Sequence, residues 1–532
     1  MVQPGSCVVS IDLGTSGPRV AVVGEDGRIL AAHSEPVGFE WVGEHGAEQD
    51  PEALWEATRT SVAKAVAASG VPRERILALI CGSQYSSLVP VDESGSPVGP
   101  LYLYLDQRGA RHARRMLARR PELVSTWFAV HGRPCGGTGE DSLSSLLFVR
   151  EERPRIYERA HCFLEPMDYV TARFTGRCAA NQCTIVMLLL GDNRRFGTQR
   201  YHPELVEGTG VDPAKLPPLS AVDAVLGPVH PELAEAIGLS PDTQVIAAVN
   251  DSQTLAMGTG SFQGRHLGLS IGTTIVPVTF ADRLDEAHDR LLPMDPANLL
   301  MPMPGPLESP KGHHLVMAEL GLAGKALEHL LHQVVYADDR LGRHGREDLY
   351  GAVEEAVAQV PAGSDKLLYL PWLSGSWMPA ADEAVRGGYL NVSLKTTRQH
   401  LVRATLEGVA YQLRWAMPGL AGFVGHGCEA FRFGGGGARS AAWAQILADV
   451  TGVPVEVMEA PQYTNCRGGA MLAYQRLGRL GLDELAGWVR ASDTREPDPA
   501  TRARYDELAE QYVKVHEALT PIFRQLNAPA SG

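Results

Sequence analysis

An aspartate at the end of a predicted strand is well placed for proton-transfer chemistry. The apolar run 244–249 predicts a buried strand, and Asp251 follows it where a helix of small residues begins. A carboxylate there lies in the positive field of the helix dipole, which can hold it ionised. Such a group can accept the proton of a hydroxyl that is being phosphorylated. Taken alone, Asp251 would be interpreted as a helix N-cap.

Two turns that contain glycine and threonine have the composition of phosphate-binding hairpins. In the first, Gly14 and Gly17 can direct successive backbone N–H groups to one side, and Thr15-Ser16 adds hydroxyl donors. Asp12, at the end of the preceding strand, can hold Mg²⁺ through water. The alternative is an ordinary hairpin whose glycines serve only the turn. A second turn at 272–274 repeats the plan and favours phosphate binding.

The flanking segments predict how these residues are positioned. Apolar runs at 7–11 and 20–23 predict the strands of a hairpin around the first turn, and 269–278 predicts a second hairpin. A chain of 532 residues is longer than a single hydrophobic core supports. Two such hairpins therefore suggest two related domains that face each other across a nucleotide.

Polar residues also follow other predicted strands. The strand 76–81 runs into Gln84-Tyr85-Ser86, and ligands of open α/β sheets bind beyond the carboxyl ends of strands. These residues are candidate substrate contacts, with a polar turn as the alternative. An alternating strand that ends at Asp106 and Arg108 puts a carboxylate and a guanidinium on one side. They can bind vicinal hydroxyls or pair with each other, and spacing alone favours the ion pair.

A glycine run precedes a predicted helix in the second half of the chain. Gly434 to Gly437 are consecutive, and the helix 441–451 follows them. Glycines let the backbone approach a flat ligand closely, and the helix N-terminus behind them favours an anion. A glycine run by itself is a weak signal.

Composition limits the class of partner. The net charge of −14 argues against a nucleic-acid or anionic-membrane surface, so we expect a small-molecule substrate. We find no apolar run of about 18 residues and no N-terminal signal pattern, and we therefore expect a cytoplasmic protein. The eight cysteines include no CxxC pair and are expected to be mostly reduced core thiols.

Together the motifs resemble the FGGY family of carbohydrate kinases, within the actin, heat-shock chaperone and sugar-kinase superfamily. The similarity runs from about residue 7 to residue 480 and includes the scaffold element 165–176, the signature 367–388 and the adenosine motif 434–455. It implies an α/β protein of two ribonuclease-H-like (actin-like ATPase) domains that flank a catalytic cleft and close on substrate. We place them at 1–257, with the sugar pocket, first hairpin and Asp251, and at 258–532, with the second hairpin and adenosine site.

The resemblance implies ATP-dependent phosphorylation of a hydroxyl of a small sugar or polyol, with Asp251 as general base, Mg²⁺ at Asp12 and a possible homodimer. It implies nucleotide contacts from Gly14, Thr15, Ser16, Gly17, Arg19, Gly272, Thr273, Thr274, Gly435, Gly436, Gly437 and Ser440. Sugar contacts are implied for Gln84, Tyr85, Tyr104, Asp106, Arg108 and Asp251.

The chain also departs from the family pattern. Tyr104 replaces the usual Trp, Tyr85-Ser86 stands where xylulokinases carry Met-His, and Ser145 replaces a Lys. The segment 467–473 matches the closing Gly-Ala-Ala helix apart from Gly469, and Arg467 is a further departure. We expect these departures in or near the sugar pocket, which would differ from a standard xylulose pocket. We expect xylulose as the default substrate, and glycerol, gluconate, ribulose and other polyols are the alternatives. The alternative function is a catalytically weakened nucleotide- or sugar-binding protein of the same fold.

Overall fold

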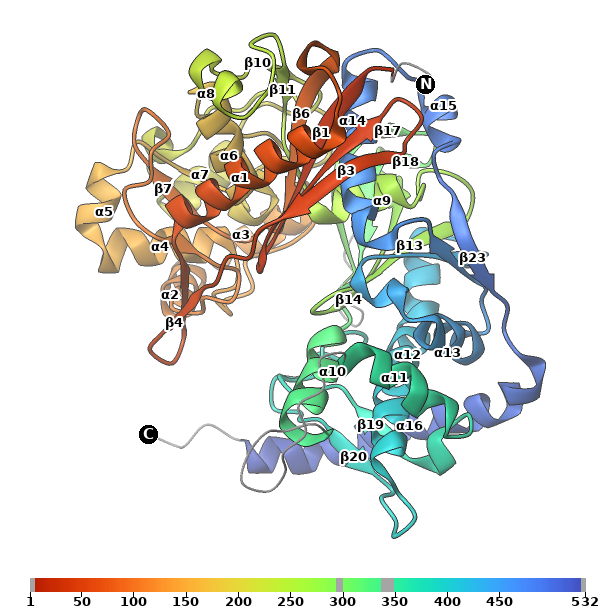
Figure 1. The fold of residues 1–532 in the computed structure, drawn as a ribbon. Helices are drawn as coiled ribbons and strands as arrows, with labels where there is room; N and C mark the ends of the chain where they lie inside the picture. The colour runs from red at the N-terminus through yellow and green to blue at the C-terminus, as the bar shows by residue number, and fades with distance from the viewer. Residues whose placement is uncertain (1–4, 293–299, 336–348, 528–532) are drawn as a thin grey trace.

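A computed structural model describes residues 5–292, 300–335 and 349–527, and two large mixed sheets organise it (Figure 1). In the first sheet, an antiparallel β1–β2–β3 meander continues through parallel strands β6 and β11 to an antiparallel edge. In spatial order its strands are β10 (Val225–Pro228), β11 (Gln244–Ile246), β6 (Ile76–Ser83), β1 (Cys7–Gly14), β2 (Gly17–Gly24) and β3 (Ile29–Ser34), while β12 (Val249–Asn250) also pairs with β6.

The second sheet repeats this plan in six of its strands and has one further strand at an edge. The hairpin β13–β14 matches β1–β2, the parallel strands β21 and β22 match β6 and β11, and β18 and β23 match the two outer strands. In spatial order its strands are β17 (Met301–Ser309), β18 (Gly312–Met317), β14 (Ile275–Ala281), β13 (His266–Ile271), β21 (Ala430–Gly434), β22 (Val455–Met458) and β23 (Ala491–Arg495). The prediction of two related α/β domains is confirmed.

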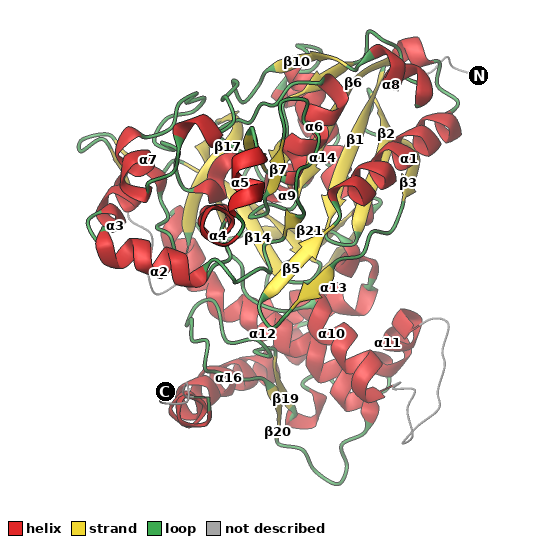
Figure 2. Cartoon of the chain, turned by 90° about the vertical axis from the view of Figure 1, so that its left-hand side faces the viewer, coloured by secondary structure: helices red, strands yellow, loops and turns green. Residues whose placement is uncertain are grey.

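Helices surround the two sheets, and α10, α11, α12, α13 and α16 gather in the lower part of Figure 2. The first half contains α1 (Pro51–Ser69), α2 (Ala110–Arg119), α3 (Leu123–Thr126), α4 (Ser142–Glu152), α5 (Pro154–Arg159), α6 (Pro166–Thr175), α7 (Pro203–Thr209), α8 (Pro231–Ala236) and α9 (Asp251–Gly258). The second contains α10 (Gly324–Leu330), α11 (Leu349–Ala358), α12 (Arg398–Val424), α13 (Ala441–Thr451), α14 (Thr464–Arg476), α15 (Leu482–Ala486) and α16 (Pro499–Leu526).

Smaller strands and short helices complete the described chain. The strands are β4 (Glu40–Val42), β5 (Gly46–Gln49), β7 (Val89–Val91), β8 (Leu101–Tyr102), β9 (Cys162–Leu164), β15 (Leu284–Asp285), β16 (Arg290–Leu291), β19 (Leu368–Leu370) and β20 (Gly388–Leu390). The helices are η1 (Arg73–Arg75), η2 (Trp127–His131), η3 (Ile185–Leu188), η4 (Pro213–Lys215), η5 (Leu331–Val335), η6 (Ser364–Lys366), η7 (Gly436–Arg439) and η8 (Pro461–Tyr463).

Two predicted segments differ from the observed ones. The strand predicted over 244–249 is divided into β11 and β12, because the Ala247 N–H bonds to the Ala224 carbonyl instead of continuing the ladder. The strand predicted to end at Asp106 stops at Tyr102, where a turn begins that is closed by the Asp106 N–H and the Leu103 carbonyl.

Helix α14, from the second half of the chain, packs against the first sheet, and both views place it beside β1 (Figures 1 and 2). A buried cluster joins residues of β1 and β6 to Leu255 of α9 and to Cys466 and Met471 of α14. The Tyr474 hydroxyl donates to the Ser6 carbonyl at 2.7 Å. We propose that the boundary between the two domains lies between residues 257 and 258, because each side of it contains one of the two sheets. Helix α14 belongs to the second half of the chain but packs on the sheet of the first.

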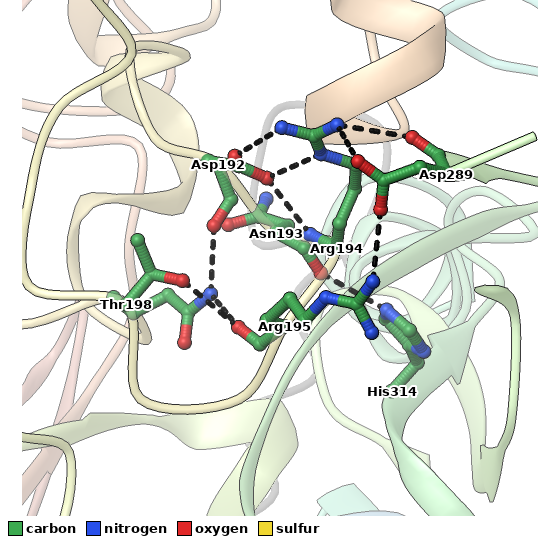
Figure 3. Close-up of polar contacts among 8 residues, drawn as sticks. Asp192, Asn193, Arg194, Arg195, Thr198, Asp289 and His314 are labelled. Carbon is green, nitrogen blue, oxygen red and sulfur yellow. Dashed lines mark hydrogen bonds and ion pairs between the residues drawn. The ribbon is translucent and has the colours of Figure 1, made fainter. Parts of the chain in front are cut away.

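A polar contact joins a loop of the first half to strands of the second (Figure 3). The Asp289 carboxylate pairs with Arg194 at 2.7 Å and with Arg195 at 3.0 Å. The buried imidazole of His314, in β18, lies with Nε2 3.0 Å from the Asn193 carbonyl oxygen, while its Nδ1 accepts from the Arg283 N–H. These bonds tie the two halves together away from the hairpin tips.

All eight cysteines are free, and six of them are buried, as the composition predicted. Among the described helices we find none with the length and apolar character needed to cross a membrane.

Candidate active site

A cleft of about 2110 Å³ is lined by residues of both halves of the chain. It brings together the tips of both hairpins and most of the predicted sugar contacts. The predicted residues that line it are Gly14, Thr15, Ser16, Gly17, Arg19, Gln84, Tyr85, Tyr104, Arg108, Asp251, Gly272, Thr273 and Thr274. Asp12, Asp106, Gly435, Gly436, Gly437 and Ser440 are not among the lining residues.

The first hairpin is built as the sequence predicted. Gly17 has φ 120°, and a Cβ atom there would lie 2.2 Å from the Glu35 carbonyl oxygen, so the turn requires glycine. The Thr15 hydroxyl bonds to the Gln84 side-chain oxygen, and its Oγ1 lies 3.5 Å from the Tyr104 hydroxyl. The predicted phosphate turn and the predicted sugar contacts therefore adjoin each other directly.

Asp12 lies just behind this hairpin and is only 5% exposed. One carboxylate oxygen accepts from Arg19 at 3.0 Å, and the other accepts from the Asn465 side chain of α14 at 3.3 Å. Asn465, which also lines the cleft, was missed in the sequence because it is distant from every phosphate motif. A carboxylate is the kind of hard oxygen ligand that Mg²⁺ prefers, so the chemistry of Asp12 fits a magnesium ion held through water.

Asp251 is the first residue of α9 and lines the cleft. The interpretation of Asp251 as the N-cap is wrong, because the cap is Asn250: its side chain accepts from the Gln253 N–H at 3.0 Å, and Gln253 bonds back. Asp251 is thereby left free for the cleft. Burial, together with the charges of Asp12 and Glu319, raises the pKa of Asp251 to about 7.

Glu319 is a second cleft carboxyl group, which the sequence did not single out. It follows β18 and faces the tip of the second hairpin. Burial raises its pKa to about 7, although a hydrogen bond from Thr274 opposes this shift. The apolar run before it predicts only a buried strand, so no local signal distinguishes it. Its charge contributes to the raised pKa of Asp251 across the cleft.

Asp106 and Arg108 form the ion pair that their spacing favoured. The Asp106 carboxylate is buried, bonds to the Arg108 guanidinium and accepts from the Ala47 N–H at 3.1 Å. A further bond of 2.6 Å joins Arg108 to Glu48. Arg108 still reaches the cleft wall, whereas Asp106 lies behind it.

The glycine loop lies against the second hairpin. Gly435 has φ 81°, and a Cβ atom there would lie 2.6 Å from Ser270 Oγ, so the close approach requires glycine. Ser440 caps α13 through the Trp443 N–H, and Glu354 of α11 bonds to Ser440 and to the Ala442 N–H. The loop therefore adjoins the cleft through Ser270, which lines it.

Two of the predicted departures lie outside the cleft lining. Ser145 is buried in α4, and the prediction that it lies at the sugar pocket finds no support in the lining. Arg467 is buried in α14, where it donates to the carbonyls of Gly27 and Glu459. Its role is structural, since these bonds connect α14 to the turn between β2 and β3 of the first sheet and to the segment that follows β22 of the second. Tyr85 and Ser86 do line the cleft.

Solved structures with the same fold cover almost the whole chain. A ligand-bound xylulose kinase from Lactobacillus acidophilus superposes with a TM-score of 0.82 at 20% identity, covering 98% of this chain and all of that one. A gluconate kinase from the same organism gives 0.81 at 19% identity, covering 98% and 99%. The chain thus has the actin-like ATPase fold, with two mixed α/β domains around a cleft.

Sequence comparison identifies the family. Residues 7–258 match the N-terminal domain, and residues 294–475 the C-terminal domain, of the FGGY family of carbohydrate kinases. A xylulose kinase of Staphylococcus epidermidis is 24% identical over 98% of both chains, and a gluconokinase of Bacillus licheniformis is 21% identical over 98% of both. This chain belongs to the FGGY family and is a carbohydrate kinase.

Proposed function

We propose that this kinase transfers the γ-phosphoryl group of ATP, as its magnesium complex, to a hydroxyl of a small sugar or polyol. Asp251 acts as the general base. The observation that carries the proposal is the position of Asp251, whose carboxyl group has a pKa of about 7 and shares one cleft with both glycine hairpins. A base with a pKa near the working pH combines correct protonation with useful basicity.

The residues present fit ATP and magnesium. Side chains built at Gly272 and Gly436 would meet nothing within 4 Å, so the second hairpin and the glycine loop present open backbone to a ligand. Asp12 would hold Mg²⁺ through water, and the two hairpins would hold the phosphates. When bound, the metal and the backbone N–H groups supply positive charge to the transferring oxygens.

Within this arrangement the residues of the chain orient the sugar and move one proton. Gln84 and Tyr104 contact the Thr15 hydroxyl, so a sugar held by these side chains lies beside the phosphate turn. The sugar hydroxyl gives its proton to Asp251 as its oxygen bonds to phosphorus, and the bond from phosphorus to ADP breaks. The product is a sugar phosphate.

Asp251→Asn tests this role. The substitution is nearly isosteric, and Asn250 still caps α9, so the fold and ATP binding should persist. Coupled-assay turnover should fall at least about a hundredfold, the lower end of what a general base contributes. Asp483→Asn, in the first turn of α15, is a matched control outside the cleft and should retain full turnover. Retained turnover in Asp251→Asn would exclude the base.

Several expectations accompany this proposal. We propose a cytoplasmic enzyme with no nucleic-acid or membrane partner, and a homodimer stays a prediction for light scattering to test. A wild-type protein that binds nucleotide but phosphorylates no sugar, polyol or sugar acid would favour the alternative of a catalytically weakened binding protein.

A further inference from the structure

The cleft contains a guanidinium that the proposed chemistry does not use. Arg133 follows η2 in a glycine-rich loop, is half-buried and lines the cleft. Within the described part of the chain, no carboxylate lies within ion-pairing distance of it, and its hydrogen bond goes to the Met187 sulfur at 3.2 Å, a weak acceptor. Arg108, the predicted sugar-binding arginine, is by contrast paired with Asp106 and Glu48.

A second unsatisfied polar side chain lies beside it. His131 is 1% exposed and lines the same cleft, and neither ring nitrogen has a hydrogen-bond partner among the described residues. Burial and the charge of Arg133 lower the pKa of His131 to about 4. The carbonyls of Arg133 and Val186 oppose this shift, but neither is in hydrogen-bonding geometry with the ring. The imidazole is therefore neutral and can donate one hydrogen bond to a ligand.

These two residues belong to the same part of the cleft as the proposed base. The charges of Asp251, Glu319 and Arg133 all act on the Tyr85 hydroxyl, whose oxygen lies 3.0 Å from the Met317 sulfur. A substrate that places a hydroxyl at Asp251 can therefore extend past Tyr85 toward Arg133.

A half-buried cation that has no counter-ion among the described residues, beside an imidazole that has no hydrogen-bond partner among them, is costly unless a ligand completes both. A carboxylate matches a guanidinium in shape, because its two oxygens accept two parallel N–H bonds. A phosphate dianion would ordinarily require more than this single cation. We propose that Arg133 and His131 form a carboxylate subsite, and that the preferred substrate of this kinase is a sugar acid. This inference rests on the proposed function.

The competing explanation is that Arg133 forms an ion pair with the other domain when the two domains close. Glu319 lies on the opposite wall of the cleft, and the positive charge of Arg133 opposes the rise in the pKa of Glu319. Closure of the two domains could bring these two side chains together. A closure pair would affect all substrates alike, whereas a carboxylate subsite affects only acids. This difference determines the test.

The experiment compares sugar acids with neutral partners of the same carbon skeleton: xylonate with xylitol, and gluconate with glucitol, with xylulose added as a neutral ketose. In the wild type, kcat/KM should be highest for an acid. Arg133→Met should lower kcat/KM for that acid at least about a hundredfold, mainly through KM, because a buried polar partner is removed. Its effect on neutral substrates should stay within a few-fold.

Two further variants complete the design. Arg133→Lys keeps the charge without the planar fork and should recover part of the affinity for the acid. Arg155→Met removes an exposed guanidinium of α5 that is not part of the cleft lining and should behave as wild type. Calorimetric binding of xylonate and gluconate, without ATP, measures the subsite separately from turnover.

The outcomes separate this inference from the proposed function. Wild-type preference for the neutral polyols or for xylulose would overturn the carboxylate subsite and leave the kinase proposal standing. An equal loss on acids and neutral substrates in Arg133→Met would also overturn it, in favour of closure. Acid binding that depends on Arg133, without phosphorylation of any compound, would support the subsite and refute the proposed reaction.

Discussion

At the scale of single residues, the electrostatics of the cleft centre on Asp251. Its raised pKa means that the base is protonated in mildly acidic solution, so kcat/KM should rise with pH up to about 7. Glu319 contributes to this pKa by charge repulsion. Glu319→Gln should therefore move the acidic limb of the kcat/KM profile to lower pH, which initial rates from pH 5 to pH 8 would measure.

Glu328→Gln is the matched control for this prediction, because it removes an exposed carboxylate of α10 that pairs with Lys325 and is absent from the cleft lining. Its pH profile should coincide with that of the wild type. A Glu319→Gln profile that also coincides would show that the two cleft carboxyl groups do not interact in solution.

At the scale of elements, two adjacent residues at the start of α9 have different roles: Asn250 caps the helix, and Asp251 is the proposed base. Asn250 is fully buried and caps the helix through a reciprocal pair of bonds with Gln253, while Asp251 faces the cleft. Asn250→Ala should lower the free energy of unfolding by about 1–2 kcal/mol, the usual cost of a lost N-cap. Asp251→Asn should not lower it, because a carboxyl group whose pKa is raised by burial does not stabilise the folded state at neutral pH. Urea unfolding of both variants and the wild type gives the comparison, and equal stabilities for all three would contradict the assignment of the cap.

At the scale of the whole molecule, His314 helps to join the two halves as a neutral imidazole (Figure 3). Burial, with His313 and Arg283 nearby, lowers its pKa from 6.5 to about 4 despite the opposing charge of Asp282. The unfolded chain then binds the proton more tightly than the folded one. The stability that His314 contributes is therefore present above pH 6.5 and is lost as the pH falls toward 4.

His314→Gln tests this dependence. Other buried groups also titrate, so the relevant quantity is the difference in unfolding free energy between variant and wild type at each pH. Between pH 7.5 and pH 5 the wild type should lose about 2 kcal/mol more than the variant, at about 1.4 kcal/mol per pH unit below 6.5. Parallel pH dependences would mean that His314 is protonated in the folded protein without cost.

The sequence alone determined the local parts of this protein, because their information lies in a few adjacent residues. Turns that need glycine at Gly17 and Gly435, and the buried strands beside them, are encoded where they occur. Two neighbouring residues that both favour N-caps, Asn250 and Asp251, could not be separated in this way. Only the three-dimensional packing, with its reciprocal bond from Gln253, assigned the cap to Asn250 and left Asp251 for the cleft.

The tertiary structure alone decided which charges meet. Asp12 bonds to Asn465, far away in the sequence, because α14 packs on the first sheet, and Glu319 reaches the cleft because the second sheet faces the first. Among the described residues, Arg108 has carboxylate partners and Arg133 has none, although both are arginines of the first half of the chain. The physical reason is that pairing and desolvation depend on distances between side chains, which an amino-acid sequence specifies only through the complete fold.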